Sequence, residues 1–448
     1  MASGQESTRG RLARLRRERG SGATEEPKPA RHGVPGWLAN HLERRAGARL
    51  SGTTHVAPAA TDHGWSRTCG DPSRLSLEWN RLGTYAVRRE EVAVAGLTHG
   101  AFSLAEVDHA DPRAIARLTG DPALGSIDLR RAVFLDTETT GLSGGAGVYV
   151  YMVGLGWFEG ERYVSWQGFL RSPGEEGAML QAVADIVGGA DHLVSFFGKS
   201  FDRHRLEDKM RIVGVTPPFA GRPHLDLYHP MRRLTRGELN DGKLQTMERE
   251  LLGFQRARDL PGSLAPAAWF DYLAGRPHLL EGVFEHNRED VLTLTVLAAY
   301  LGCAVIEQRV NGEALPGPAA QRARALMETS SSREEQLGWA DEALRRGLGG
   351  EDRRRAMLVR AQLLRRLGRV DGARHAYREA LEDAADDIVA VELFVGASML
   401  LERPLGDLEN ALAMARRAAH LASELGRPRS VLAGLDRRVE RLSRAAGK

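Results

Sequence analysis

Two acidic side chains, Asp136 and Glu138, follow a short apolar run in the stretch RAVFLDTETTG at 131–141. The apolar residues at 132–135 are typical of a buried strand. Since side chains alternate along a strand, the two carboxylates share one face and repel each other. A hard divalent cation such as Mg²⁺ or Mn²⁺, which takes oxygen ligands, offsets that repulsion. The alternative is a solvated strand end that runs into a turn.

Further acids stand where the same site would need them. Asp202 follows a strand-like run and begins a helix in FFGKSFD. His286 and Asp290 are four residues apart, which places them on one helical face. Asp226 ends a short strand in HLDL. Each position also has an ordinary interpretation. Asp202 would be a first-turn acid that complements the helix dipole. His286 and Asp290 would be a surface pair, and Asp226 would be a structural acid at a strand end.

The elements expected around these residues are strands and helices in a defined order. After the opening strand we expect strands at 149–158, 162–170, 193–197 and 224–227, the first two joined by a hairpin. Helices are expected at 173–187, 200–213, 243–252, 264–273 and 278–300. Three strands in meander order followed by alternation predict an α/β fold with an RNase H-like mixed sheet flanked by helices.

The length of 448 residues predicts two or three structural units. We divide the chain into a basic, disordered arm at 1–60, a small β-containing lead-in at 61–129, the α/β domain at 130–305, a linker at 306–318 and a helical domain at 319–448. The first fifty residues hold eleven Arg or Lys against five Glu, which suits contact with nucleic acid and equally a solubilising tail. The lead-in contains strand-like pieces at 84–87 and 92–95.

The segment at 319–448 is rich in Ala, Leu, Arg and Glu, with helical periodicity. The stretch AQLLRRLG at 361–368, followed by small residues at 373, 376 and 380, resembles one unit of a tetratricopeptide repeat. Residues 393–401 and 411–425 would form a degenerate second unit. A plain helical bundle is the alternative.

Cysteine usage and hydropathy exclude several classes of protein. Cys69 and Cys303 lie far apart, which excludes a Cys-rich zinc site and a disulfide framework and fits a reducing cytoplasm. No apolar run approaches the roughly 20 residues that span a bilayer, and the basic N-terminus lacks the apolar core of a secretory signal. We therefore expect a cytoplasmic protein with no membrane partner.

Taken in order, the acidic motifs resemble those of the YprB-type RNase H-like family, within the DEDD superfamily of 3′–5′ exonucleases. The resemblance covers about residues 130–302. It is carried by FLDTETTGL at 134–142, GGAG at 144–147, GKSFD at 198–202, KLQTMERELLG at 243–253 and HNREDV at 286–291. The chain departs from the pattern at two places. Phe197 stands where exonuclease relatives often have Asn, and His286 precedes Asp290 by three intervening residues instead of four.

The resemblance implies two divalent metal ions, Mg²⁺ or Mn²⁺, whose ligands are Asp136, Glu138, Asp202 and Asp290. Independently of the family, hydrolysis of a phosphodiester needs an activated water and a stabilised leaving oxygen, and two ions about 4 Å apart supply both. His286 would deprotonate or orient the attacking water.

Three further residues are expected to assist this site. Asp226 is expected to act from outside the metal shell, and Lys199 and Lys243 to contact substrate phosphates. For each lysine, a solvated surface position is the alternative.

Two functions are compatible with these motifs. The first is a metal-dependent nuclease, a 3′–5′ exonuclease that hydrolyses DNA or RNA by a two-metal mechanism. The second is a catalytically idle RNase H-like protein that binds nucleic acid or acts as a scaffold, and whose helical domain binds a partner protein. The presence of all four acids and a histidine favours the first.

Overall fold

A computed structural model describes residues 74–141, 147–257 and 260–447. The predicted basic arm, Cys69 and most of the glycine-rich GGAG motif lie outside these residues. Among the described residues, no helix has the length and apolar character needed to cross a membrane.

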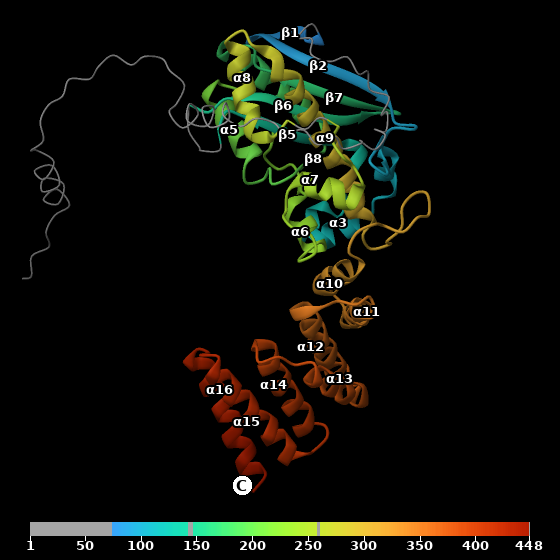
Figure 1. Ribbon diagram of the computed structural model, residues 1–448, viewed down its shortest axis with the longest axis vertical. Helices are drawn as coiled ribbons and strands as arrows, with labels where there is room; N and C mark the ends of the chain where they lie inside the picture. The colour runs from blue at the N-terminus through green and yellow to red at the C-terminus, as the bar shows by residue number, and fades with distance from the viewer. Residues whose placement is uncertain (1–73, 142–146, 258–259, 448) are drawn as a thin grey trace, which may run out of the picture. The chain divides into compact units, whose positions relative to one another are not determined.

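A seven-stranded mixed sheet forms the centre of the α/β part (Figure 1). Its strands are β1 (Ser76–Asn80), β2 (Gly83–Ala93), β5 (Ala132–Thr139), β6 (Val150–Glu159), β7 (Arg162–Phe169), β8 (His192–Ser195) and β9 (His224–Asp226). The order is β1-β2-β7-β6-β5-β8-β9, with β8 parallel to β5 and to β9 and the other pairs antiparallel. This confirms the RNase H-like mixed sheet expected from the order of elements.

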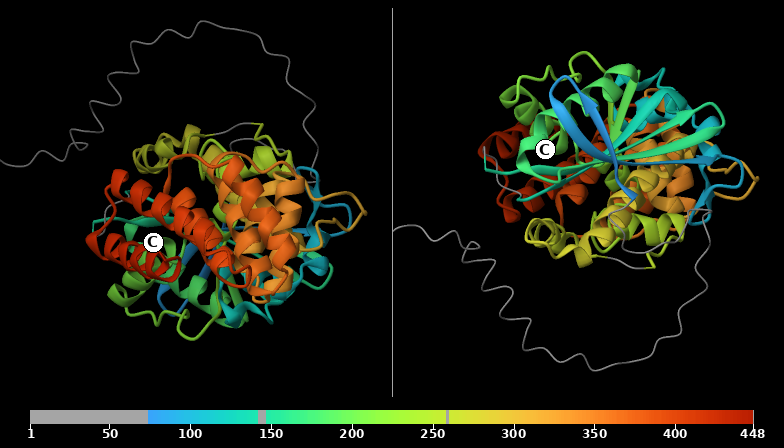
Figure 2. Two further views of the ribbon diagram at one scale, coloured as in Figure 1. Left: turned by 90° about the horizontal axis from the view of Figure 1, so that it is seen from below. Right: turned by 90° about the horizontal axis from the view of Figure 1, so that it is seen from above.

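The strand-like piece at 84–87 and the beginning of the one at 92–95 lie in β2, which extends the main sheet. β2 pairs with β7 from Ala86 opposite Phe169 to Ala93 opposite Arg162, and β1 pairs with β2. Without β2, the backbone N–H and C=O groups on one side of β7 would be unpaired at the edge of the sheet. Pairing with β2 supplies their hydrogen-bond partners. A separate two-stranded ribbon, β3 (Thr98–His99) and β4 (Phe102–Ser103), follows. Figure 2 shows the strands of the main sheet as a twisted fan.

Helices cover both faces of this sheet. The helices of the α/β part are α3 (Pro112–Thr119), α4 (Glu176–Gly189), α5 (Asp202–Ile212), α6 (Tyr228–Leu234), α7 (Leu244–Met247), α8 (Ala265–Leu273) and α9 (Leu280–Cys303), of which α4, α5, α8 and α9 contact the strands of the sheet. Short 3₁₀ turns lie at Leu104–His109, Pro122–Leu124, Leu129–Arg131, Pro173–Glu175, Gly262–Leu264 and Pro277–Leu279. The helix expected at 243–252 is only partly α-helical, because α7 continues as a π-helical turn at Glu248–Leu252.

The alternation of side chains along β5 decides which helix the acidic pair faces. Phe134 packs in the buried cluster that includes Val291 of α9. Val133 and Leu135 pack in the other cluster, which includes residues of α4, α5 and α8. Asp136 and Glu138 continue the face of Phe134 and therefore point toward α9, the helix that carries His286 and Asp290.

The described part of the segment after residue 318 is helical, as predicted. Its helices are α10 (Ala319–Thr329), α11 (Arg333–Arg345), α12 (Gly350–Arg366), α13 (Val370–Glu382), α14 (Ile388–Glu402), α15 (Leu408–Glu424) and α16 (Arg429–Ala445). Consecutive helices pack against one another, and α12 also contacts α14. Ala361, Ala373 and Ala376 are buried where α12 and α13 meet, so the predicted small residues do lie at a helix crossing.

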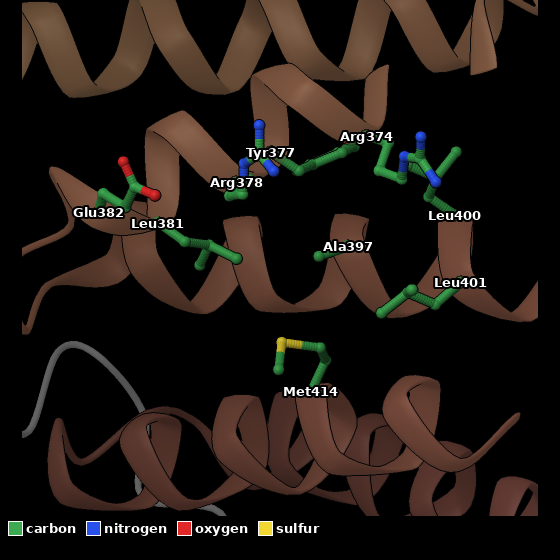
Figure 3. A pocket seen from close by; sticks show the side chains of 9 residues that line it. All are labelled: Arg374, Tyr377, Arg378, Leu381, Glu382, Ala397, Leu400, Leu401 and Met414. Carbon is green, nitrogen blue, oxygen red and sulfur yellow. The ribbon is translucent and has the colours of Figure 1, made fainter. Parts of the chain in front are cut away.

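A cavity of about 330 Å³ opens between α13, α14 and α15 (Figure 3). Its lining comprises Arg374, Tyr377, Arg378, Leu381, Glu382, Ala397, Leu400, Leu401 and Met414. The lining is therefore mostly apolar, with two arginines and one glutamate among its side chains.

Candidate metal centre

Asp136 is held in place by an amide side chain on α9. Asn287 is fully buried, and its Nδ2 donates to Asp136 Oδ2 at 2.8 Å. Gln167 of β7 donates in turn to Asn287 Oδ1 at 2.9 Å. A β-carbon at Gly154, the residue opposite Asp136 on β6, would collide with Asn287 Oδ1. The glycine therefore leaves the space through which Asn287 reaches Asp136.

Asp202 is tied to the same strand by a hydroxyl group. It is the first residue of α5 and is buried. Its Oδ1 accepts a hydrogen bond from Oγ1 of Thr137, the residue between Asp136 and Glu138. The β8–α5 loop and the end of β5 thus meet through a direct side-chain contact.

Glu138, His286 and Asp290 form the closest group of metal-ligand side chains. One potential ligand atom from each lies within 4.8 Å of the others. On α9, His286 Nε2 lies 3.4 Å from Asp290 Oδ2, as expected for residues four apart on one face. The structure therefore brings Glu138, His286 and Asp290 into one group. Asp136 and Asp202 lie outside that group but close enough for the charges of these acids to affect one another.

Burial and mutual repulsion raise the pKa of three of these acids. Burial and the charges of Asp290 and Asp202 raise the pKa of Glu138 to about 8. The pKa of Asp136 lies well above its usual value, first because of burial and then because of Asp290 and Glu138. Burial raises the pKa of Asp202 to about 6. A raised pKa means that the ionised carboxylate is unfavourable in the folded protein. When several of these acids are ionised, the cluster therefore contains too little positive charge to balance them.

One positive charge within the cluster comes from Arg256, a residue that the sequence analysis missed. Its guanidinium is almost fully buried, with 5% of the side chain exposed. It donates to Asp290 Oδ1, to Glu248 Oε2 at 2.9 Å and to His286 Nδ1 at 2.8 Å. Glu289, on the same helix as His286 and Asp290, also approaches Arg256, with Oε2 at 3.5 Å from Nε. Although burial disfavours the charged guanidinium, Asp290 and Glu248 together raise the pKa of Arg256.

Asp226 supports the loop that presents Asp202. Its two oxygens accept backbone N–H groups of Phe197 at 2.8 Å, Lys199 at 3.0 Å and Tyr228 at 3.1 Å. A carboxylate with three such donors acts as a backbone clamp between β8, β9 and α5. This contact set agrees with a supporting position outside the metal shell.

The two predicted lysines pair with acids outside the carboxylate cluster. Lys199 Nζ lies 3.8 Å from Asp121, and Lys243 Nζ lies 3.7 Å from Asp241. The Lys243 side chain is 76% exposed, so it is available to solvent and not fixed at the cluster. Lys199 is near the site through its backbone, which Asp226 holds.

Phe197 occupies an unusual backbone conformation beside the site. Its φ is 61°, a left-handed value that costs a bulky side chain about 1–2 kcal/mol. The side chain is 44% exposed and contacts Tyr228 edge to face, with ring centroids 4.9 Å apart. Asn tolerates this conformation better, which gives a physical reason for the Asn that exonuclease relatives often have here.

The chemistry of the donor set fits a hard divalent cation. The converging side chains from β5, α5 and α9 offer carboxylate oxygens, the ligands that Mg²⁺ and Mn²⁺ prefer. Within the described residues 74–141, 147–257 and 260–447, the guanidinium of Arg256 is shared among Asp290, Glu248 and Glu289, so it offsets only part of their negative charge. Asp136, Glu138, Asp202 and Asp290 are the residues that would hold such ions.

Comparisons with known proteins agree with this fold. A family model described as the RNase_H superfamily matches residues 133–302. The uncharacterized protein YprB of Bacillus subtilis (strain 168) is 30% identical over 247 residues, which cover 52% of this chain and 58% of that protein. The chain thus matches less than two thirds of the length of this relative. Residues 133–302 therefore form an RNase H-like domain, and the chain is similar to YprB over about half of its length.

Proposed function

We propose that this protein is a metal-dependent nuclease that hydrolyses phosphodiester bonds, and specifically a 3′–5′ exonuclease of the DEDD type. The observation that carries the proposal is a buried cluster of carboxylates from β5, α5 and α9. The cluster holds too little positive charge to balance these acids, as their raised pKa values indicate. Structural ion pairs do not account for that arrangement, because each buried charge in such a pair has its own partner. The RNase H-like fold supports the same conclusion.

In this mechanism each acid has a defined place. Asp136, Glu138, Asp202 and Asp290 hold two divalent ions, Mg²⁺ or Mn²⁺. When bound, such ions supply a nucleophilic water at neutral pH and stabilise the leaving oxygen. Asn287 fixes the orientation of Asp136, Thr137 fixes that of Asp202, and His286 orients the attacking water from its position beside Asp290.

The proposed substrate is a nucleic acid, DNA or RNA, that presents an unpaired end to the cluster. Phe197 is the observation that favours a splayed terminal base, because an exposed aromatic ring beside Asp202 offers a stacking surface. Replacement Phe197→Ala should raise KM for single strands about tenfold, with little change in kcat. An unchanged KM would remove Phe197 from the substrate site. Lys199 and Lys243 are proposed to attract phosphates through exposed, weakly paired ammonium groups.

The test of the proposed function uses oligonucleotides labelled separately at the 3′ and the 5′ end. With Mn²⁺ or Mg²⁺, the wild-type chain should shorten the 5′-labelled strand stepwise and release the 3′ label as mononucleotide. Internal cuts without stepwise shortening would contradict the exonuclease proposal and indicate an endonuclease. No hydrolysis of any DNA or RNA substrate by the wild-type chain would favour the idle scaffold alternative.

A second candidate function is protein binding by the tetratricopeptide-like helical region. The observation that favours it is the cavity between α13, α14 and α15, whose mostly apolar lining carries Arg374 and Arg378 (Figure 3). This lining suits a bulky apolar side chain flanked by acidic residues. A short acidic peptide with a central leucine should bind the wild-type chain and lose that binding in Met414→Arg. Equal binding by both chains would exclude the cavity as the docking site.

A further inference from the structure

The contact between Arg256 and His286 determines where the imidazole carries its proton. Arg256 Nη1 lies 2.8 Å from His286 Nδ1. A guanidinium is always protonated and only donates hydrogen bonds, so Nδ1 must accept and cannot carry hydrogen. The neutral ring therefore carries its hydrogen on Nε2.

The resulting tautomer removes both ring nitrogens from metal coordination. A metal ion binds an imidazole nitrogen through its lone pair. The lone pair of Nδ1 is engaged by Arg256, and Nε2 carries the hydrogen and faces Asp290 Oδ2 at 3.4 Å. Of the three side chains that converge within 4.8 Å, only Glu138 and Asp290 can then serve as ligands. By the same reasoning His286 donates a hydrogen bond to a water and does not accept its proton.

A buried network holds Arg256 in this position. Glu248 accepts from Arg256 through both oxygens, at 2.9 Å and 2.5 Å. Thr293 Oγ1 donates to the same Glu248 at 2.6 Å and contacts His99 Nε2 at 2.7 Å. Glu248, Thr293 and His99 are each at most 1% exposed. The guanidinium is therefore held by buried side chains, and its contact with His286 is part of this buried network.

We propose that Arg256 determines the metal selectivity of this site by denying the His286 imidazole to the cation. The site keeps carboxylate oxygens as its protein ligands, which suit Mg²⁺ and Mn²⁺. Zn²⁺ and Co²⁺, which gain from imidazole, lose that advantage. The selectivity role rests on the proposed function, whereas the tautomer rests on the Arg256 contact alone.

The direct test is nitrogen NMR of the metal-free wild-type chain labelled with ¹⁵N-histidine. Long-range ¹H–¹⁵N correlations distinguish a protonated ring nitrogen from an unprotonated one, and His286→Gln identifies the signal among the 14 histidines. We expect hydrogen on Nε2 and none on Nδ1. Hydrogen on Nδ1 would overturn the inference. This measurement needs neither metal nor nucleic acid and no variant at Arg256.

The second test measures the ratio of Zn²⁺ to Mn²⁺ affinity by competition. The variant Arg256→Met is paired with Glu248→Gln, so that one buried positive and one buried negative charge are removed together. The ratio should rise at least tenfold in this double variant and stay at the wild-type value in Arg256→Lys. Adding His286→Gln to the double variant should abolish the rise. A ratio that does not change in the double variant would overturn the proposal.

The two failures can be told apart. Hydrogen on Nδ1 together with normal Mn²⁺ binding overturns the role of Arg256 and leaves the proposed nuclease intact. Hydrogen on Nε2 without any binding of Mn²⁺ overturns the nuclease and the selectivity role together.

Discussion

Carboxylates in the helical region and carboxylates at the end of β5 have opposite electrostatic surroundings. In the helical region, hydrogen bonds from Arg345 and Arg346 lower the pKa of Glu342 to about 2. Arg441 and Arg438 similarly lower the pKa of Glu402. At the end of β5, burial and neighbouring acids raise the pKa of Glu138 to about 8.

This difference separates acids that complete a fold from acids that need a ligand. Glu342 and Glu402 each pair with two arginines, so their charges are already balanced in the folded chain. At the end of β5, among the residues that the structure describes, Arg256 divides its charge among Asp290 and the neighbouring Glu248 and Glu289. Four predictions test whether the two regions differ in this way, from the largest expected effect to the smallest.

The largest effect should come from removing one charge of the cluster. Asp136→Asn keeps the shape of the side chain and its contact with Asn287, but removes a proposed metal ligand. Loss of metal assistance is worth several kcal/mol, so the rate should fall on the order of 10³-fold. The measurement is single-turnover hydrolysis in Mn²⁺ at saturating enzyme. A variant with more than a tenth of the wild-type rate would contradict the role of Asp136.

A smaller loss should follow from removing the residue that orients Asp136. Asn287→Ala leaves all four acids in place but removes the amide that links Asp136 to Gln167. Loss of such a support costs about 10–100-fold in metal affinity or activity. Excess Mn²⁺ should restore part of the rate in Asn287→Ala and none in Asp136→Asn. Identical responses of the two variants to Mn²⁺ would remove the distinction between ligand and support.

Stability of the metal-free protein should fall as pH rises from 6.5 to 8. Over this pH window the folded chain keeps a proton on Glu138, whose pKa is about 8. In the unfolded chain the pKa of this side chain is 4.5, so the proton has already been released. The folded state therefore binds more protons, and raising the pH removes about 1–2 kcal/mol of stability. The window excludes the buried His224, whose pKa burial lowers from 6.5 to about 3 and which contributes only below 6.5.

The measurement for this third prediction is the urea midpoint in EDTA at several pH values. Glu138→Gln should make the decline shallower without abolishing it, because burial also raises the pKa of Glu289 to about 8. Saturating Mn²⁺ should reverse the decline, because the metal replaces the proton. If the metal-free protein gained stability between pH 6.5 and 8, the buried acids of the cluster would not keep their protons in the folded state, and this account of the cluster would be refuted.

The smallest effect should come from the helical region. Glu402→Gln removes a partly exposed acid that pairs with Arg438 and Arg441. We expect a loss of about 0.5–1 kcal/mol in stability and no change in nuclease rate. The control is the thermal midpoint measured with and without Mn²⁺, which should shift equally in both conditions. A change in rate would show that the two regions are not independent.

Local patterns were sufficient to predict the main elements of the α/β part. The apolar run before Asp136 and the helical spacing of His286 and Asp290 both reflect periodicity, which is a property of neighbouring residues. The carboxylates could be identified because their motifs appear in order along the chain. Local patterns predicted strand-like pieces at 84–87 and 92–95 but not their partner, because the pairing of β2 with β7 joins residues some 75 positions apart.

The supporting residues could not be predicted for a similar reason. Arg256 lies in a segment without helical or strand periodicity, and its partners Glu248, His286 and Asp290 come from other elements. Asn287 is adjacent to His286 in the sequence, yet its contact with Asp136 depends on the space at Gly154. Only the excess of acids indicated that the site needed a buried cation.

Calorimetric titration of Mn²⁺ into the wild-type chain, Asp136→Asn and Glu402→Gln tests the central claim most directly. We predict binding of two ions to the wild type and to Glu402→Gln, with loss of that binding in Asp136→Asn. Absence of binding to the wild type, or equal binding to all three chains, would contradict a metal centre at the end of β5.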